Sequence, residues 1–311
     1  MGKDCCVDEL AMVEWLRTTL PQGSGVILGP GDDCALLDVS GARELAVTTD
    51  TLLEGTHFLA TDDAELVGWK TAAVSVSDLA AMGCRPQWAV TGAGLRRGTD
   101  EAWLRGFVAG LSRCARLFGM GLVGGDITSW DHPASFTLTA FGSPWPGGPV
   151  RRSGARPGDI LAVTGSLGGS FPDRHLCFLP RVEESRRLCA SGAVTAMMDL
   201  SDGLALDLRR LCAMSGVGVT VDAAHLPVST EARDQAKGDP EAMLRKALCD
   251  GEDFELVFAV RPDAWDALAT AWDHATPITR IGVFTSGRSR TLRCGDGDRP
   301  LPEGGYVHAI G

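Results

Sequence analysis

The chain of 311 residues lacks any apolar run long enough to cross a bilayer, although 44% of its residues are hydrophobic. A transmembrane helix needs roughly 18 or more consecutive apolar residues, so no membrane partner is expected. The first 15 residues carry Asp4, Asp8, Glu9 and Glu14 where a secretory signal would be apolar. This argues against export, and the predicted location is the cytoplasm.

The sequence also lacks a Cys-x-x-Cys pair and has few basic residues. Its ten cysteines are scattered, and a cytosolic chain of this length does not need disulfides, so we expect reduced thiols. There are 29 Lys and Arg against 40 Asp and Glu, a formal net charge of −11. Nucleic-acid binding needs a basic surface, so no nucleic-acid partner is expected. A small phosphorylated substrate is compatible if metal ions lie between the anions.

The familiar nucleotide-binding motifs are missing as well. The Walker A pattern is absent, because the only Gly-Lys pair is Gly2-Lys3. No Gly-x-Gly-x-x-Gly follows an expected strand, and the protein-kinase catalytic-loop signature is absent. A nucleotide would need another cradle, such as the backbone N–H groups of Gly124-Gly125 or of a helix that starts near Ser201. The glycine-rich run 165–170 is a weaker candidate.

What the sequence does have is an alternation of strand and helix patterns in both halves. In the first half, helices are expected over residues 62–82, with an aspartate cap, and over residues 100–118. A Pro- and Gly-rich segment, residues 144–149, separates the halves. Since globular domains run to roughly 100–200 residues, we predict an α/β (α+β) protein of two domains, residues 1–148 and 149–311.

Carboxylates fall at the ends of the expected strands or in the turns after them. The expected strands are 45–49, 87–92, 122–123, 135–141, 160–164, 196–199, 217–221, 254–260 and 278–283. Asp50 and Asp126 each close a strand, and Asp199 and Asp202 follow another. In α/β folds, ligands bind at the carboxyl ends of strands. Asp78 differs because it lies in an apolar helix, where an unpaired carboxylate is costly to bury.

Taken singly, each aspartate is explained as a turn former or a helix cap. Taken together, the aspartates suggest a shared metal site. Two carboxylates about 4 Å apart repel by about 4 kcal/mol at an effective dielectric near 20. If these side chains converge, cations must hold them together. Oxygen ligands without Cys/His spacing favour Mg²⁺ over zinc.

Seven sequence blocks, taken in order, resemble the thiamine-monophosphate kinase family. They are Gly29–Asp33 (GPGDD), Thr48–Phe58 (TTDTLLEGTHF), Ser77–Gly83 (SDLAAMG), Gly124–Asp126 (GGD), Arg152–Asp159 (RSGARPGD), Asp199–Ala205 (DLSDGLA) and Gly251–Leu256 (GEDFEL). The resemblance runs from about residue 25 to residue 306. The Ser-Asp-Leu-Ala-Ala-Met-Gly and Glu-Gly-x-His-Phe blocks are the most specific.

That family belongs to the aminoimidazole-ribonucleotide-synthetase-like superfamily, so the resemblance implies both a fold and an activity. The implied fold has an N-terminal ATP- and Mg²⁺-binding α/β domain that pairs through its sheet with its copy in a homodimer. A C-terminal α/β domain packs against it. The implied activity is phosphorylation of thiamine monophosphate to thiamine diphosphate, with ATP as co-substrate and several Mg²⁺ ions.

The resemblance also implies site residues. The implied Mg²⁺ ligands are Asp33, Thr48, Thr49, Asp50, Asp78, Asp126, Asp199 and Asp202. The implied ATP contacts are Gly125, Asp126, Arg152 and Ser201, and the implied thiamine-phosphate contacts are His57, Glu252 and Tyr306. The catalytic roles fall to Asp126, Asp202 and Arg152. Without the resemblance, His57 and Arg152 would be interpreted as surface residues, and Tyr306 as a side chain that fills a hydrophobic gap.

The expected mechanism is direct in-line phosphoryl transfer. The acceptor phosphate has a second pKa near 6 and is largely ionised at neutral pH, so no general base is required. The chain departs from the family pattern at Pro30, usually Ile, at Asp250, usually Gly, and in the short segment 171–180, which replaces a longer helical insertion. These departures remove no proposed ligand.

Two alternatives stay open at this point. One is another ATP-using enzyme of the superfamily, such as an aminoimidazole-ribonucleotide synthetase or a selenophosphate synthetase. The latter would need a reactive cysteine near the N-terminus, where Cys5 and Cys6 stand, but its lysine partner is not apparent. The other alternative is a non-catalytic protein that binds divalent metal or nucleotide. The full acidic set favours an enzyme.

Overall fold

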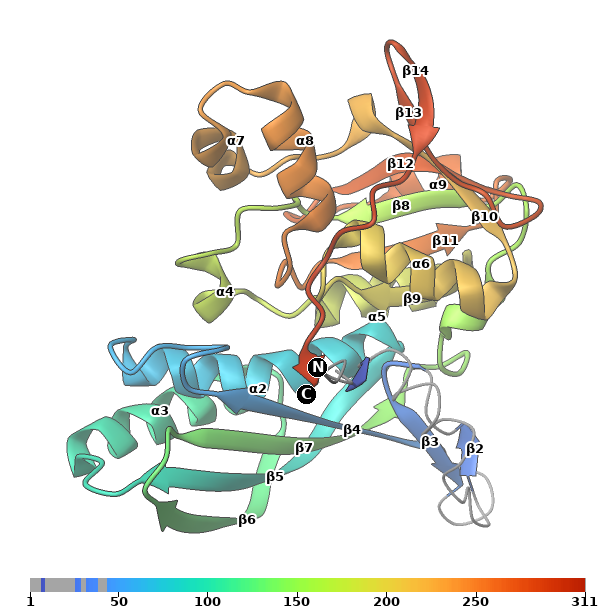
Figure 1. Ribbon diagram of the computed structural model, residues 1–311. Coiled ribbons are helices and arrows are strands. Elements are labelled where there is room, and N and C mark those ends of the chain that lie inside the picture. Colours follow the sequence, from blue (N-terminus) through green and yellow to red (C-terminus); the bar gives the residue numbers. More distant parts are fainter. Residues whose placement is uncertain (1–6, 9–25, 29–31, 39–43, 311) are drawn as a thin grey trace.

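The computed structural model describes residues 7–8, 26–28, 32–38 and 44–310 and contains two large sheets (Figure 1). The first has the strand order β2 (Val26–Leu28), β3 (Ala35–Asp38), β4 (Glu44–Leu53), β7 (Ser135–Pro144), β5 (Cys84–Arg96) and β6 (Gly121–Trp130). All neighbours are antiparallel except β5 and β6. Helices α2 (Ala64–Ala81) and α3 (Glu101–Leu117) pack on one face. Among the described residues, no helix covers the other face.

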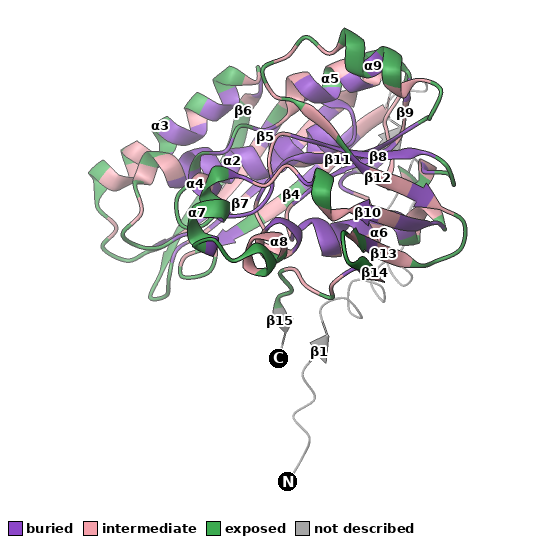
Figure 2. Ribbon diagram, turned by 90° about the horizontal axis from the view of Figure 1, so that it is seen from above, coloured by how far each residue is buried: buried purple, intermediate pink, exposed green. Residues whose placement is uncertain are grey.

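Helix α2 forms the middle of the molecule. Its N-cap Asp63 accepts the N–H of Leu66 at 3.1 Å, and the chain leaves the helix at Gly83, whose φ is +67°. These are the usual start and stop signals. The helix contacts strands β4 and β7 on one side and, on the other, helix α5 (Val182–Ser191) and strand β9 (Val194–Asp199) of the second sheet. It is therefore buried nearly all round (Figure 2).

The second sheet has seven strands. Their order is β14 (Gly297–Pro300), β13 (Arg290–Cys294), β10 (Gly218–Asp222), β12 (Ile278–Thr285), β8 (Ile160–Thr164), β11 (Leu256–Val260) and β9. Only β10 and β13 are parallel. Helices α5 and α9 (Trp265–Ala271) share one core with this sheet, and α6 (Leu204–Ser215) and α8 (Pro240–Cys249) share another. The short helices α4 (Arg174–Cys177) and α7 (Thr230–Ala236) complete it.

The last segment of the chain runs from the second sheet back to the first. It passes from Leu301 to the short strand β15 (Ala309–Ile310), which pairs antiparallel with β1 (Val7–Asp8). A strand near the start of the chain therefore pairs with one near its end (Figure 1). In the described part of the chain, no helix has the length and apolar character needed to cross a membrane.

The mixed α/β prediction with two sheets is confirmed, and the helices expected over residues 62–82 and 100–118 are α2 and α3. The expected ends of two strands are wrong. Asp50 lies inside β4 and Asp126 inside β6, because apolar and β-branched residues extend both strands beyond them. Both sheets are also largely antiparallel, so the acids do not share one carboxyl edge. The division at residues 148 and 149 stays a prediction.

Candidate functional site

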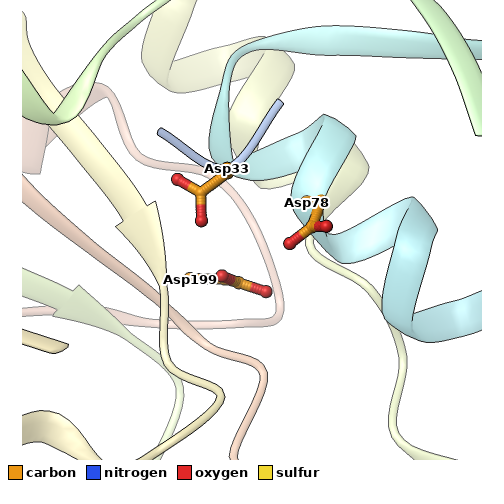
Figure 3. A group of neighbouring side chains, drawn as sticks. All are labelled: Asp33, Asp78 and Asp199. Carbon is orange, nitrogen blue, oxygen red and sulfur yellow. The ribbon is translucent and has the colours of Figure 1, made fainter. Parts of the chain in front are cut away.

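Three carboxylates from distant parts of the chain meet between the two sheets. Asp33 lies in the turn before β3, Asp78 lies on α2, and Asp199 ends β9 (Figure 3). One oxygen of each lies within 4.8 Å of the other two. Asp33 and Asp199 are buried, and Asp78 is half-buried. We refer to these three residues as the acidic cluster. The convergence expected from the sequence is present for these three residues.

Hydroxyl groups fix the orientation of the carboxylates. Ser77 Oγ donates to Asp199 Oδ2 at 2.5 Å, and Thr48 Oγ1 donates to Asp78. Ser75 Oγ donates at 2.6 Å to Oδ2 of a fourth carboxylate, on Asp50. Such bonds leave the other carboxylate oxygens free for a cation.

The acidic cluster is electrostatically crowded in the absence of a cation. Burial raises the pKa of Asp78 well above its usual value, and the neighbouring charges of Asp50, Asp199 and Asp33 raise it further. Burial and then Asp33 raise the pKa of Asp199 in the same way. Burial also raises the pKa of Asp50, with Asp33 adding to it. A divalent cation would relieve this repulsion, and the oxygen-only donor set fits Mg²⁺.

Arg152 is the guanidinium beside this group. Its terminal nitrogen pairs with Asp33, its Nε lies 3.1 Å from Asp33 Oδ2, and its backbone N–H donates to Asp32 Oδ2 at 3.0 Å. Burial and the charge of Asp33 nevertheless raise the pKa of Asp32 to about 6. A single arginine therefore leaves the acids only partly neutralised. Its pairing with Asp33 also occupies the group that the sequence predicted as a phosphate contact.

A cavity of about 590 Å³ opens between the two sheets. The predicted site residues that line it are Thr49, Asp50, His57, Ser201, Asp202, Glu252 and Tyr306. Asp50 joins the cavity to the acidic cluster, because it lines the first and adds to the charge of the second. Burial lowers the pKa of His57, so its ring is neutral at neutral pH. The structure thus brings the three predicted thiamine-phosphate contacts into one place.

Asp202 lies in the cavity wall but outside the acidic cluster. Its carboxylate pairs with Arg210, which also binds Asp207 at 2.7 Å. The backbone N–H of Asp202 donates to Asp207 Oδ2 at 2.9 Å. This arrangement holds the start of α6 next to Ser201.

Gly125 and Asp126 are not brought to the cluster within one chain. Both lie on the edge strand β6, where Gly125 pairs with Thr91 and Asp126 with Gly92. Across the sheet, Asp126 is in register with Thr51 of β4, three strands away, or roughly 14 Å at the usual strand spacing. The Asp126 side chain is exposed.

Sequence reasoning missed several residues of this region. Ser75 and Lys70 are polar residues of the buried helix α2, and His175 and Phe171 come from the short segment after Gly165. A signal was available for the helix. Lys70 and Ser77 are seven residues apart, so two turns of helix place them on one face. A polar stripe on an otherwise apolar buried helix marks a site.

Comparison with known proteins agrees with this architecture. Residues 31–143 match the family model of the AIR synthase related protein, N-terminal domain, and residues 173–295 match that of the C-terminal domain. The fold and the acidic cluster therefore define a two-domain protein of the AIR-synthase-related class.

Individual relatives show to which family of this class the chain belongs. A thiamine-monophosphate kinase of Rhodopirellula baltica is 34% identical, over 96% of this chain and 97% of its own length. That of Escherichia coli K12 is 38% identical, over 84% and 85%. A solved structure, "AaThiL complexed with AMPPCP and TMP", has a TM-score of 0.84 and 28% identity, and covers 97% of each chain. The chain belongs to the thiamine-monophosphate kinase family.

Proposed function

We propose that the protein transfers the γ-phosphate of ATP to the phosphate of thiamine monophosphate and forms thiamine diphosphate and ADP. One observation carries the proposal: the acidic cluster adjoins, through Asp50, a cavity lined by His57, Glu252 and Tyr306. This arrangement supports a cation-binding site next to a space for an organic substrate. The related structure that was solved with AMPPCP and TMP supports the same pair of substrates.

Magnesium fits the donor set described above. The residues proposed to hold it are Asp33, Asp50, Asp78 and Asp199, with Thr48, Thr49, Asp126 and Asp202 as further ligands. When bound, Mg²⁺ supplies positive charge that offsets the phosphate oxygens and the carboxylates together. Arg152 pairs with the acidic cluster and in this arrangement neutralises Asp33. We propose that Arg152 turns to a phosphate oxygen when cations take over that role.

The transfer step needs no base from the protein. An ionised phosphate oxygen of thiamine monophosphate attacks the γ-phosphorus of ATP, a new P–O bond forms, and the bond to the β-phosphate oxygen breaks. ADP leaves with that electron pair. The residues of the cavity orient the acceptor: Glu252 and His57 at one side, and Tyr306 from the C-terminal segment. Gly125 and Ser201 are proposed as ATP contacts. Positioning of this kind supplies much of the rate in phosphoryl transfer.

We also propose a homodimer formed through the first sheet. Its edge strand β6 exposes Val123 at 62% and Ile127 at 67%, and Trp88 of β5 is exposed at 47%. An unpaired edge with large apolar side chains favours association. A second copy is the occupant that fits, because Asp126 lies on this strand and needs a site outside its own chain. Pairing would then bring Asp126 of the partner subunit to the cavity.

Two further properties complete the proposal. A cytoplasmic location fits the free cysteines at the positions that the structure describes and the availability of ATP there. The domain division at residues 148 and 149 lies between β7 and β8. A synthetase-like reaction of the same superfamily is not favoured, since the relatives that are 34% and 38% identical over most of the chain are thiamine-monophosphate kinases. Cys5 and Cys6 lie outside the described residues.

A direct assay tests the function. Purified protein is incubated with Mg²⁺, thiamine monophosphate and ATP labelled in the γ-phosphate, and the products are separated. The label is expected in thiamine diphosphate, with ADP formed in equal amount and no stable label on the protein. Absence of thiamine diphosphate would overturn the function, and a stable phosphoprotein would overturn direct transfer.

A further inference from the structure

Lys70 is a fully buried lysine in the middle of α2, with 0% of its surface exposed. Its Nζ lies 2.6 Å from Glu252 Oε2, 2.9 Å from His175 Nδ1 and 2.8 Å from the backbone oxygen of His57. An ammonium group has three N–H donors, and three polar atoms lie within hydrogen-bond distance of the Lys70 nitrogen. A buried charge persists only with such pairing.

The partners of Lys70 lie in different walls of the cavity or contact a residue that does. His57 comes from the loop after β4, and Glu252 comes from the loop before β11 of the second sheet. His175 stacks on Phe171 with ring centroids 4.1 Å apart, and Phe171 also lines the cavity. One ammonium therefore ties together segments of both sheets around the substrate space.

Glu252 is held in a conformation that it would not adopt by itself. Its φ is +61°, a left-handed value that is strained for a non-glycine residue. Its backbone N–H donates to the Ser201 oxygen at 2.6 Å. Lys70 and His175 both contact Oε2, so Oε1 is the oxygen left for a ligand. Burial tends to raise the pKa of Glu252, but the bonds from His175 and Lys70 outweigh it and lower that pKa.

We propose that Lys70 is a positioning residue that sets the affinity for the acceptor substrate. It fixes the ionised Glu252 carboxylate and, through His175, the Phe171 ring. A carboxylate and an aromatic face together suit a heteroaromatic cation, which is the chemical character of the thiazolium ring of thiamine monophosphate. This inference rests on the proposed function and extends it to a residue outside the cavity lining.

The test compares Lys70→Met with a matched control. Arg181→Met removes a half-buried cation that lies outside the cavity lining and pairs with Glu255 at 2.5 Å. Lys70→Met is expected to raise the KM for thiamine monophosphate about tenfold or more while changing the KM for ATP less than about twofold. Arg181→Met is expected to lower Tm and leave both KM values near those of the wild type. Equal KM changes for both substrates in Lys70→Met would overturn the proposal.

Two additional measurements make the test independent of folding and of turnover. In the Glu252→Gln background, Lys70→Met should add little to the KM for thiamine monophosphate; multiplied effects would show that Lys70 does not act through Glu252. The rise in Tm with thiamine monophosphate alone should be lost in Lys70→Met and kept in Arg181→Met.

Should Lys70→Met not fold, Lys70→Arg keeps the charge with a different geometry. An unchanged KM for thiamine monophosphate in Lys70→Arg would overturn the proposal. A wild-type protein that forms no thiamine diphosphate would instead overturn the function.

Discussion

Ser77 Oγ on α2 donates a 2.5 Å hydrogen bond to Asp199 Oδ2 at the end of β9, across 122 positions of sequence. The bond joins the helix that covers the first sheet to the edge strand of the second. The next residue on α2 is Asp78, so the same turn of helix supplies one carboxylate of the acidic cluster and the hydroxyl that orients another. The packing of the two sheets and the geometry of the acidic cluster are therefore coupled through this bond.

Ser77→Ala should weaken both the packing between the two sheets and the binding of Mg²⁺ at the acidic cluster. A hydrogen bond to a charged group contributes about 1.5–3 kcal/mol, and the loss leaves Asp199 free to rotate. We expect a lower free energy of unfolding and a higher Mg²⁺ concentration for half-maximal activity. Ser185→Ala is the control, because Ser185 Oγ donates to the Ala80 oxygen at 2.6 Å and touches no carboxylate. It should lose stability without any change in the Mg²⁺ requirement. An equal Mg²⁺ shift in both variants would contradict this account.

Asp78→Asn should separate stability from activity. The substitution removes a charge from a crowded, buried group whose pKa is raised, so the metal-free protein should unfold at a higher temperature than the wild type. Activity should fall about 100-fold or more, since a cation ligand is lost. Asp131→Asn, at an exposed ion pair with Arg97, serves as control and should change neither. Thermal unfolding in EDTA, together with turnover in Mg²⁺, measures both. A destabilised and active Asp78→Asn would show that the carboxylate is structural.

The stability of the metal-free protein should fall as the pH rises. The raised pKa values of Asp78 and Asp199 mean that the folded state binds protons more tightly than the unfolded state. Their favourable contribution is complete below the unfolded values, about 3.9, and is lost as the pH rises through the folded values. Mg²⁺ competes with these protons, so its binding should release them. Urea unfolding between about pH 5 and 8 in EDTA should show the decline, and excess Mg²⁺ should reduce it. A pH-independent stability in EDTA would contradict the prediction.

Mixed dimers test where Asp126 acts. Asp78→Asn and Asp126→Asn are each expected to be inactive when pure. Unfolding and refolding an equal mixture should restore about a quarter of the wild-type activity, because half of the dimers are mixed and each has one intact site. If Asp126 served its own chain, no mixed dimer would have an intact site and no activity would return. Size-exclusion chromatography with light scattering checks that the dimer forms.

Much of the site could be predicted from the sequence. A lone carboxylate in the apolar run of α2 needs a partner if it is buried, and Asp78 does lie beside Asp33 and Asp199. The expected aspartate cap is found at Asp63, and the helix expected over residues 62–82 is α2. These features depend on local patterns, which a sequence displays directly.

The remainder depends on contacts between distant segments. The carboxylate of Asp50 accepts a hydrogen bond from Ser75 of α2, and no local pattern signals that contact. Lys70 has its role only because the loop with Glu252 and the helix with His175 reach it from the other sheet. The expected alternation of strands and helices did not specify the direction of strand pairing, and most neighbouring strands are antiparallel. Pairing direction follows from tertiary structure.

The most direct test of the central claim is a crystal structure of the protein grown with Mn²⁺ and a non-hydrolysable ATP analogue. The account predicts anomalous peaks at the acidic cluster, within roughly 2–2.5 Å of carboxylate oxygens of Asp33, Asp78 and Asp199, with nucleotide phosphate oxygens completing the coordination. A nucleotide bound without metal at these carboxylates, or metal and nucleotide in separate places, would contradict it.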